Sequence, residues 1–154
     1  MARAKKIPYL NPGRDLRTCL AKILRARFEE MIAFEKGTME GNDIEELHDM
    51  RVACRRVQAV MKVFRAAFPA EEFAKQYRVI RELKDVLGEV RHYDVFIDEL
   101  VGNRDKKRTD KAMELLIIRQ RALRERKRKE LVAYLRMLNR DNYKVQFEEF
   151  AKEN

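Results

Sequence analysis

The residues with the clearest chemical potential form a row of cations and one histidine between positions 48 and 65. Steps of three and four residues place them on one stripe of a helix: His48, Arg51, Arg55, Gln58, Lys62 and Arg65. Arg56 stands beside this stripe. One helical turn rises about 5 Å, so a polymer of phosphates would meet a new donor at each turn. Arginine forks and lysine ammonium groups both suit phosphate oxygens.

A second basic stripe follows in the next predicted helix, where steps of three and four residues connect Arg81, Lys84, Gly88 and Arg91. Counting away from Pro69 on both sides places His48 level with the region of Arg91 and His92. We therefore expect the two stripes to converge on one surface or cleft. Gly88 costs helix stability relative to alanine; close packing of another helix is the favoured explanation, and close approach of an anion is the alternative.

The elements that must position these stripes are long amphipathic helices. The first stripe runs beside an apolar register typical of a core-facing seam: Leu47, Met50, Cys54, Val57, Met61, Phe64 and Phe68. Helices are predicted at about 12–36, 43–68, 70–101, 109–140 and 142–152, with no strand signal and no domain boundary. Short connections imply antiparallel neighbours. The sequence thus predicts an all-α, antiparallel up-down four-helix bundle with a short C-terminal helix.

Local signals define the expected ends of these helices. Asn11-Pro12 resembles a helix start, and Asn42 with Glu45 resembles a capping box before the second helix. The first connection is expected at Gly37 and Gly41, and Gly102-Asn103 is expected to end the third helix.

Composition narrows the function without deciding it. The 154 residues carry a net charge of +9, from 35 Lys and Arg against 26 Asp and Glu, which favours polyanions of any kind. No apolar stretch reaches membrane-span length and no signal peptide is evident. Cys19 and Cys54 fall in apolar registers, so buried thiols and a reducing, cytoplasmic location are expected. With no serine in the chain and no Gly-rich phosphate loop, we expect no catalytic residues, no cofactor and no enzyme activity.

Two other functions remain open. Glu45-x-x-His48 and Glu89-x-x-His92 resemble half of a di-metal carboxylate site in a four-helix bundle, although Arg51 and Arg55 on the His48 stripe would repel a dication. The expectation is therefore no metal. The run 119–129, with seven basic residues and one acid, fits a solvated helix or a polyanion-binding face. Sequence-independent binding of nucleic acid through charge is the main alternative.

Two motifs give a more specific indication. His48-Asp49-Met50-Arg51-Val52-Ala53-Cys54-Arg55-Arg56 and Leu87-Gly88-Glu89-Val90-Arg91-His92-Tyr93-Asp94-Val95 resemble the two signatures of the CHAD family, the conserved histidine α-helical domain. The resemblance implies one helical domain over residues 1–154 that binds inorganic polyphosphate without catalysis. It implies the following binding residues: His48, Arg51, Arg55, Arg56, Lys62, Arg65, Arg81, Lys84 and Arg91.

The chain departs from this family in two respects. His92 stands where the family usually has Asp, and the length allows one helical bundle where the family usually has two. The chain therefore resembles half of a family domain. A homodimer would restore the missing half, and closed two-fold dimers are the commonest soluble oligomers. Apolar residues outside the main seams are candidates for the interface, unless the last helix covers its own bundle: Leu115, Ile118, Val132, Tyr143, Phe147 and Phe150.

Overall fold

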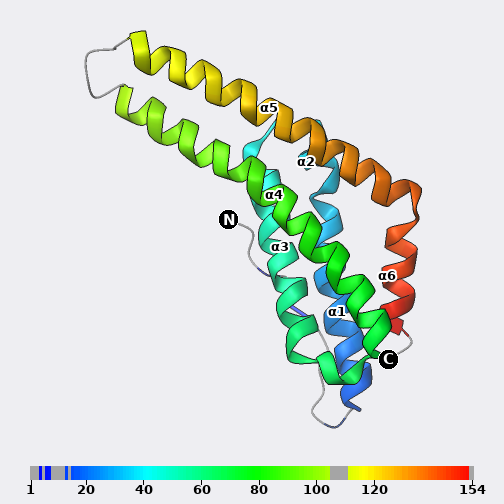
Figure 1. Ribbon diagram of the computed structural model, residues 1–154. Helices are drawn as coiled ribbons and strands as arrows, with labels where there is room; N and C mark the ends of the chain where they lie inside the picture. The colour runs from blue at the N-terminus through cyan, green and yellow to red at the C-terminus, as the bar shows by residue number, and fades with distance from the viewer. Residues whose placement is uncertain (1–3, 5, 8–12, 14, 105–110, 153–154) are drawn as a thin grey trace.

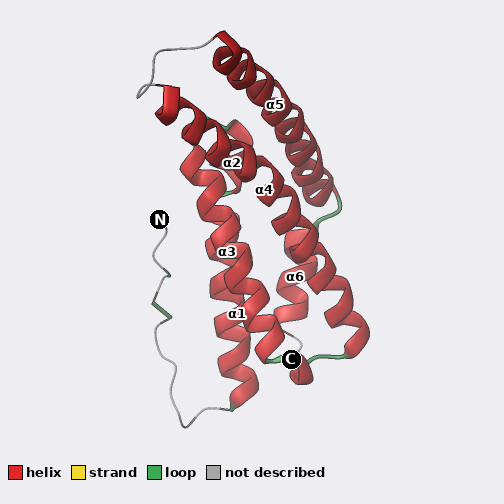
Figure 2. Cartoon of the chain, turned by 60° about the vertical axis from the view of Figure 1, so that its left-hand side comes forward, coloured by secondary structure: helices red, strands yellow, loops and turns green. Residues whose placement is uncertain are grey.

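The computed structural model is built from helices throughout its described part, which comprises residues 4, 6–7, 13, 15–104 and 111–152. No strand occurs in these residues (Figure 2). The elements follow in the order α1 (Leu16–Ala33), α2 (Glu35–Glu40), α3 (Ile44–Val63), the 3-10 helix η1 (Arg65–Ala67), α4 (Ala70–Arg104), α5 (Lys111–Arg140) and α6 (Tyr143–Lys152). The all-α prediction is confirmed.

The helices pack in two layers. In one layer α4 lies between α3 and α5 and contacts both. The second layer consists of α1 and α2, which pack mainly against α3, and of α6, which packs against α1, α4 and α5. The far ends of α4 and α5 extend together beyond the other helices (Figure 1). Consecutive long helices are neighbours as expected, but a single four-helix bundle is not confirmed, because the short α6 packs against α1, α4 and α5.

The core is built from the apolar faces of the long helices and α6, and it includes most of the predicted α3 register. Leu47, Met50, Cys54, Val57 and Met61 from the α3 seam are all buried, as are Phe28 of α1 and Phe147 of α6. Phe147 stacks on Phe28 with 4.0 Å between ring centroids. Burial of such large side chains stabilises each helix contact by about 1.5–3 kcal/mol per residue.

The last helix covers its own chain. Tyr143, Phe147 and Phe150 are buried against α1 and α4, and Phe150 stacks on Phe68 at 4.7 Å. These three residues are therefore unavailable for the dimer interface expected from the sequence. Leu115 and Ile118 remain exposed, at 67% and 62%.

Several predicted helix ends need correction. Gly37 lies inside α2, where an added Cβ would meet Glu46 at 2.7 Å, so this glycine allows close approach of α3. The side chain that caps α3 is Asp43, which accepts from the Glu45 amide at 2.9 Å, in place of Asn42. α4 continues through Gly102 to Arg104, because a single glycine lowers the stability of a helix by only about 1 kcal/mol.

The other predicted helix ends concern α1, α2 and α5. Asp15 caps α1 by accepting from the Thr18 amide, and the predicted Asn11-Pro12 start lies outside the described residues, as does the Thr109 start of the fourth helix. Gly41 ends α2 at a φ of 70°, a left-handed conformation suited to glycine.

Candidate functional site

The antiparallel packing of α3 and α4 brings the two basic stripes side by side. The Nε atom of Arg51 lies 3.4 Å from the position that a Cβ on Gly88 would occupy. From this contact, antiparallel counting places Arg55 near Lys84 and His48 near Arg91. The guanidinium of Arg91 also reaches the Glu45 carboxylate on α3, at 3.9 Å. We use the name basic seam for the cations and histidine along this packing line: His48, Arg51, Arg55, Arg81, Lys84 and Arg91.

Three polar atoms of the basic seam are buried without a hydrogen-bond partner among the described residues. They are His48 Nδ1, Arg51 Nε and Arg91 Nη1. Arginine remains protonated in proteins, so the two guanidinium atoms are donors that lack an acceptor. A buried donor left unpaired costs about 1–3 kcal/mol. An anion with several oxygens would supply the missing acceptors.

An open groove of about 620 Å³ crosses the middle of the basic seam. α4 contributes most of its lining, with Arg51 from α3 and Lys127 from α5. Two carboxylates, Asp85 and Glu89, also face the groove. Because three cations and two carboxylates line it, the groove is only weakly positive when His92 is neutral.

The lysines of the groove already have carboxylate partners. Lys84 pairs with Asp85 at 2.7 Å, and Lys127 pairs with Glu89 and with Glu130, both at 2.8 Å. Hydrogen bonds to Glu130 and Glu89 raise the pKa of Lys127. An anionic ligand must compete with these exposed pairs, which are individually weak.

The remaining predicted site residues lie in different places. Arg55 and Arg81 are exposed along the basic seam. Lys62 is exposed near the end of α3, and Arg65 lies in η1 with its guanidinium carbon 5.7 Å from the centre of the Phe73 ring. Lys62 and Arg65 therefore extend the row beyond the groove, toward the turn between α3 and α4.

Arg56 points away from the basic seam. Its guanidinium pairs with the Glu30 carboxylate on α1, which is buried and also accepts from Arg27 at 2.8 Å. Arg56, the motif residue next to Arg55, thus links α3 to α1. Its place on the other side of the helix excludes it from the groove.

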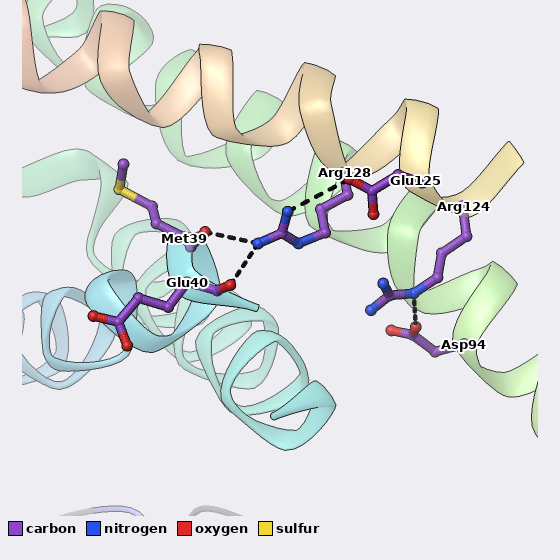
Figure 3. A network of polar contacts seen from close by, with 6 residues as sticks. All are labelled: Met39, Glu40, Asp94, Arg124, Glu125 and Arg128. Atoms are coloured by element: carbon purple, nitrogen blue, oxygen red, sulfur yellow. Dashed lines mark hydrogen bonds and ion pairs between the residues drawn. The ribbon is translucent and has the colours of Figure 1, made fainter. Parts of the chain in front are cut away.

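Lys127 is the groove cation that the motifs did not identify. It belongs to the basic run 119–129, where the sequence offers no sign of which cation faces α4. Two neighbours hold α5 in place (Figure 3). Arg124 donates through Nε to the buried Asp94 carboxylate at 2.5 Å, and Arg128 donates to the carbonyl oxygens of Met39 and Glu40 at 2.9 and 2.7 Å, which caps α2.

The side chains of the di-metal alternative have other partners. Glu45 lies near Arg91 and Glu89 binds Lys127. Within the described residues, no three His, Cys, Asp or Glu side chains are grouped so that they could hold a metal ion.

The two cysteines are free thiols. Cys19 is only partly buried, whereas Cys54 is fully buried and its burial raises the pKa of its thiol to about 12. A thiol of this kind is unreactive, so Cys54 serves the core. None of the described helices is both long and apolar enough to cross a membrane.

Comparison with known proteins gives one match. The sequence pattern of a family described as the CHAD domain matches residues 22–152. No curated protein and no solved structure matches the chain.

Proposed function

Since this chain belongs to the CHAD domain family, whose pattern covers nearly all of it, we propose that it binds inorganic polyphosphate along the basic seam without turning it over. The CHAD domain is associated with polyphosphate binding in general. The observation that carries the proposal is the set of buried, unpartnered atoms on His48, Arg51 and Arg91. These atoms come from both motifs and lie along one packing line.

The chemistry of the basic seam favours a bare phosphate chain. Guanidinium groups donate to phosphate oxygens in charge-assisted hydrogen bonds, and Lys84 adds a compact charge. Polyphosphate presents charge at every unit and has no bases to stack. The large aromatic side chains are mostly in the core, among them Phe147 and Phe150. Of the residues that line the groove, His92 and Tyr93 carry rings, so bases would find few stacking partners there.

Binding without turnover agrees with the side chains that are present. Cys54 is buried and protonated at neutral pH, and the chain contains no serine. His48 would act as a hydrogen-bond donor at one end of the row. A cytoplasmic location, where the free thiols stay reduced, is part of the same proposal.

Paired charge-neutralising variants test this proposal. Arg55→Ala with Arg81→Ala removes two exposed cations of the basic seam, and Arg25→Ala with Arg136→Ala removes two exposed cations elsewhere. Polyphosphate affinity, measured by fluorescence anisotropy, should fall about tenfold or more for the first pair, at about 1 kcal/mol per contact. Equal losses for both pairs would show that net charge alone drives binding.

Sequence-independent binding of nucleic acid is the second candidate function. The observation in its favour is the exposed basic face of α5, which carries Arg119, Arg121, Arg126 and Lys129. Such a surface attracts any polyanion and loses affinity steeply with salt. Because it lacks buried unpartnered donors, it gives charge attraction without a shaped site.

We also propose that two chains pair as a homodimer through α5, where Leu115 and Ile118 are exposed. Light scattering of the protein with and without polyphosphate tests this pairing. The double variant Leu115→Gln, Ile118→Gln should be monomeric, while a wild-type monomer under all conditions would contradict the dimer.

A further inference from the structure

Gly88 is one of the α4 residues that line the groove described above. Arg51 of α3 borders the groove on one side of α4, and Lys127 of α5 borders it on the other. Because α4 lies between α3 and α5, its outer face forms the floor of the groove, and Arg51 and Lys127 form the walls.

The space above Gly88 is open except for one cation. A Cβ at this position would meet only Arg51 Nε, at 3.4 Å, with no other heavy atom of a neighbouring element within 4 Å. Close packing of helix backbones therefore does not require this glycine. In a helix interior glycine is less stable than alanine, so its use here needs another reason. The Nε donor beside it is buried and unpartnered.

Resting on the proposed function, we propose that a polyphosphate chain bound on the basic seam continues across α4 over Gly88, from Arg51 on α3 to Lys127 on α5. The alternative route follows α3 to its end, past Lys62 and Arg65. The crossing route passes the buried donor of Arg51. The α3 route ends at Arg65, which already lies over the Phe73 ring.

The crossing over Gly88 also gives a reason why the protein would bind polyphosphate in preference to nucleic acid. A polyphosphate chain carries only oxygens on phosphorus, so it can lie directly against the backbone of α4 at Gly88. A nucleic-acid strand carries a sugar and a base at each phosphate and is wider. It can meet the exposed cations, but it fits less closely over the glycine floor.

Lys127 must exchange partners for the crossing to form. Its ammonium group is held by Glu89 and Glu130 at 2.8 Å each. Exposed ion pairs of this kind are weak, and a chain with charge at every phosphate displaces them. Removing the competing carboxylate in Glu89→Gln should tighten polyphosphate binding by about threefold, the scale of one exposed ion pair.

The first test compares Gly88→Leu with Gly102→Leu. Both glycines lie in α4, and an added Cβ at Gly102 would meet nothing within 4 Å. Leucine is the better helix former, so both variants should melt at or above the wild-type temperature. Polyphosphate affinity should fall about tenfold in Gly88→Leu, the scale of one lost charge-assisted contact, and stay unchanged in Gly102→Leu. Duplex DNA affinity should change little in either variant.

The second test compares Lys127→Ala with Lys129→Ala, which removes the same charge from an exposed position outside the groove. The Lys127 variant should lose more polyphosphate affinity. Equal losses for the two lysines, or equal binding by the two glycine variants, would overturn the crossing while leaving the proposed function in place. A wild-type protein that does not bind polyphosphate would overturn the proposed function itself.

Discussion

Replacement of Arg51 by methionine should make the protein more stable and a weaker binder. In the free protein Arg51 Nε is buried without a partner, which costs about 1–3 kcal/mol. Methionine keeps an unbranched apolar stem for packing and removes the unpaired donor. Allowing for some lost packing, we expect the free energy of unfolding to rise by about 1 kcal/mol, or about 2–4 °C in melting temperature for a chain of this size.

The same change should weaken polyphosphate binding by about 10- to 100-fold, because a hydrogen bond to a charged group contributes about 1.5–3 kcal/mol. Thermal denaturation and fluorescence anisotropy measure the two effects on one sample. The rise in stability together with the fall in affinity is the distinguishing result, since replacing a residue that only supports the fold would lower the stability of the protein.

Arg56→Met is the matched control, five residues along the same helix. Removing the Arg56 guanidinium leaves the buried Glu30 carboxylate without one of its cations, which should lower the free energy of unfolding by about 3 kcal/mol. Its polyphosphate affinity, measured well below the melting temperature, should stay near that of the wild type. The reasoning is refuted if Arg51→Met is less stable yet binds normally, or if Arg56→Met loses as much affinity as Arg51→Met.

Three further predictions concern the scaffold. Gly41→Ala should destabilise the protein by about 1–3 kcal/mol in urea denaturation, because Gly41 has a φ of 70° and an added Cβ would meet Arg128 at 2.3 Å; an unchanged midpoint would contradict this. Asp94→Asn should cost about 3 kcal/mol by breaking the buried pair with Arg124, and a loss below about 1 kcal/mol would show that the pair is dispensable. Cys54 should stay protonated in the folded protein until its pKa of about 12, against 9.0 when exposed; the folded state then binds the extra proton, so stability falls as pH rises from about 9 to 12, and Cys54→Ala should reduce that slope.

Periodicity predicted most of the helices because it depends on local spacing. The α3 register from Leu47 to Met61 is buried as expected, and the two basic stripes meet as counting from Pro69 suggested. Glycine was a less reliable predictor of helix ends. Gly37 and Gly102 lie inside helices, since one glycine lowers helix stability without necessarily ending the helix.

The positions of some site residues depend on contacts between distant parts of the chain, which the spacing of residues in the sequence does not reveal. Arg55 and Arg56 are adjacent, but only the position of Glu30 on α1 shows that Arg56 is held in the structure. Lys127 is one of seven basic residues in its run. Its place in the groove depends on how Arg124 and Arg128 fix the rotation of α5.

A competition experiment tests the central claim most directly. Labelled polyphosphate bound to the wild-type protein is challenged with unlabelled polyphosphate, duplex DNA and RNA at matched phosphate concentration and near-physiological salt. We predict that unlabelled polyphosphate displaces the label at a lower phosphate concentration than either nucleic acid. Displacement by DNA or RNA at an equal or lower concentration would contradict the account and favour a general nucleic-acid-binding protein.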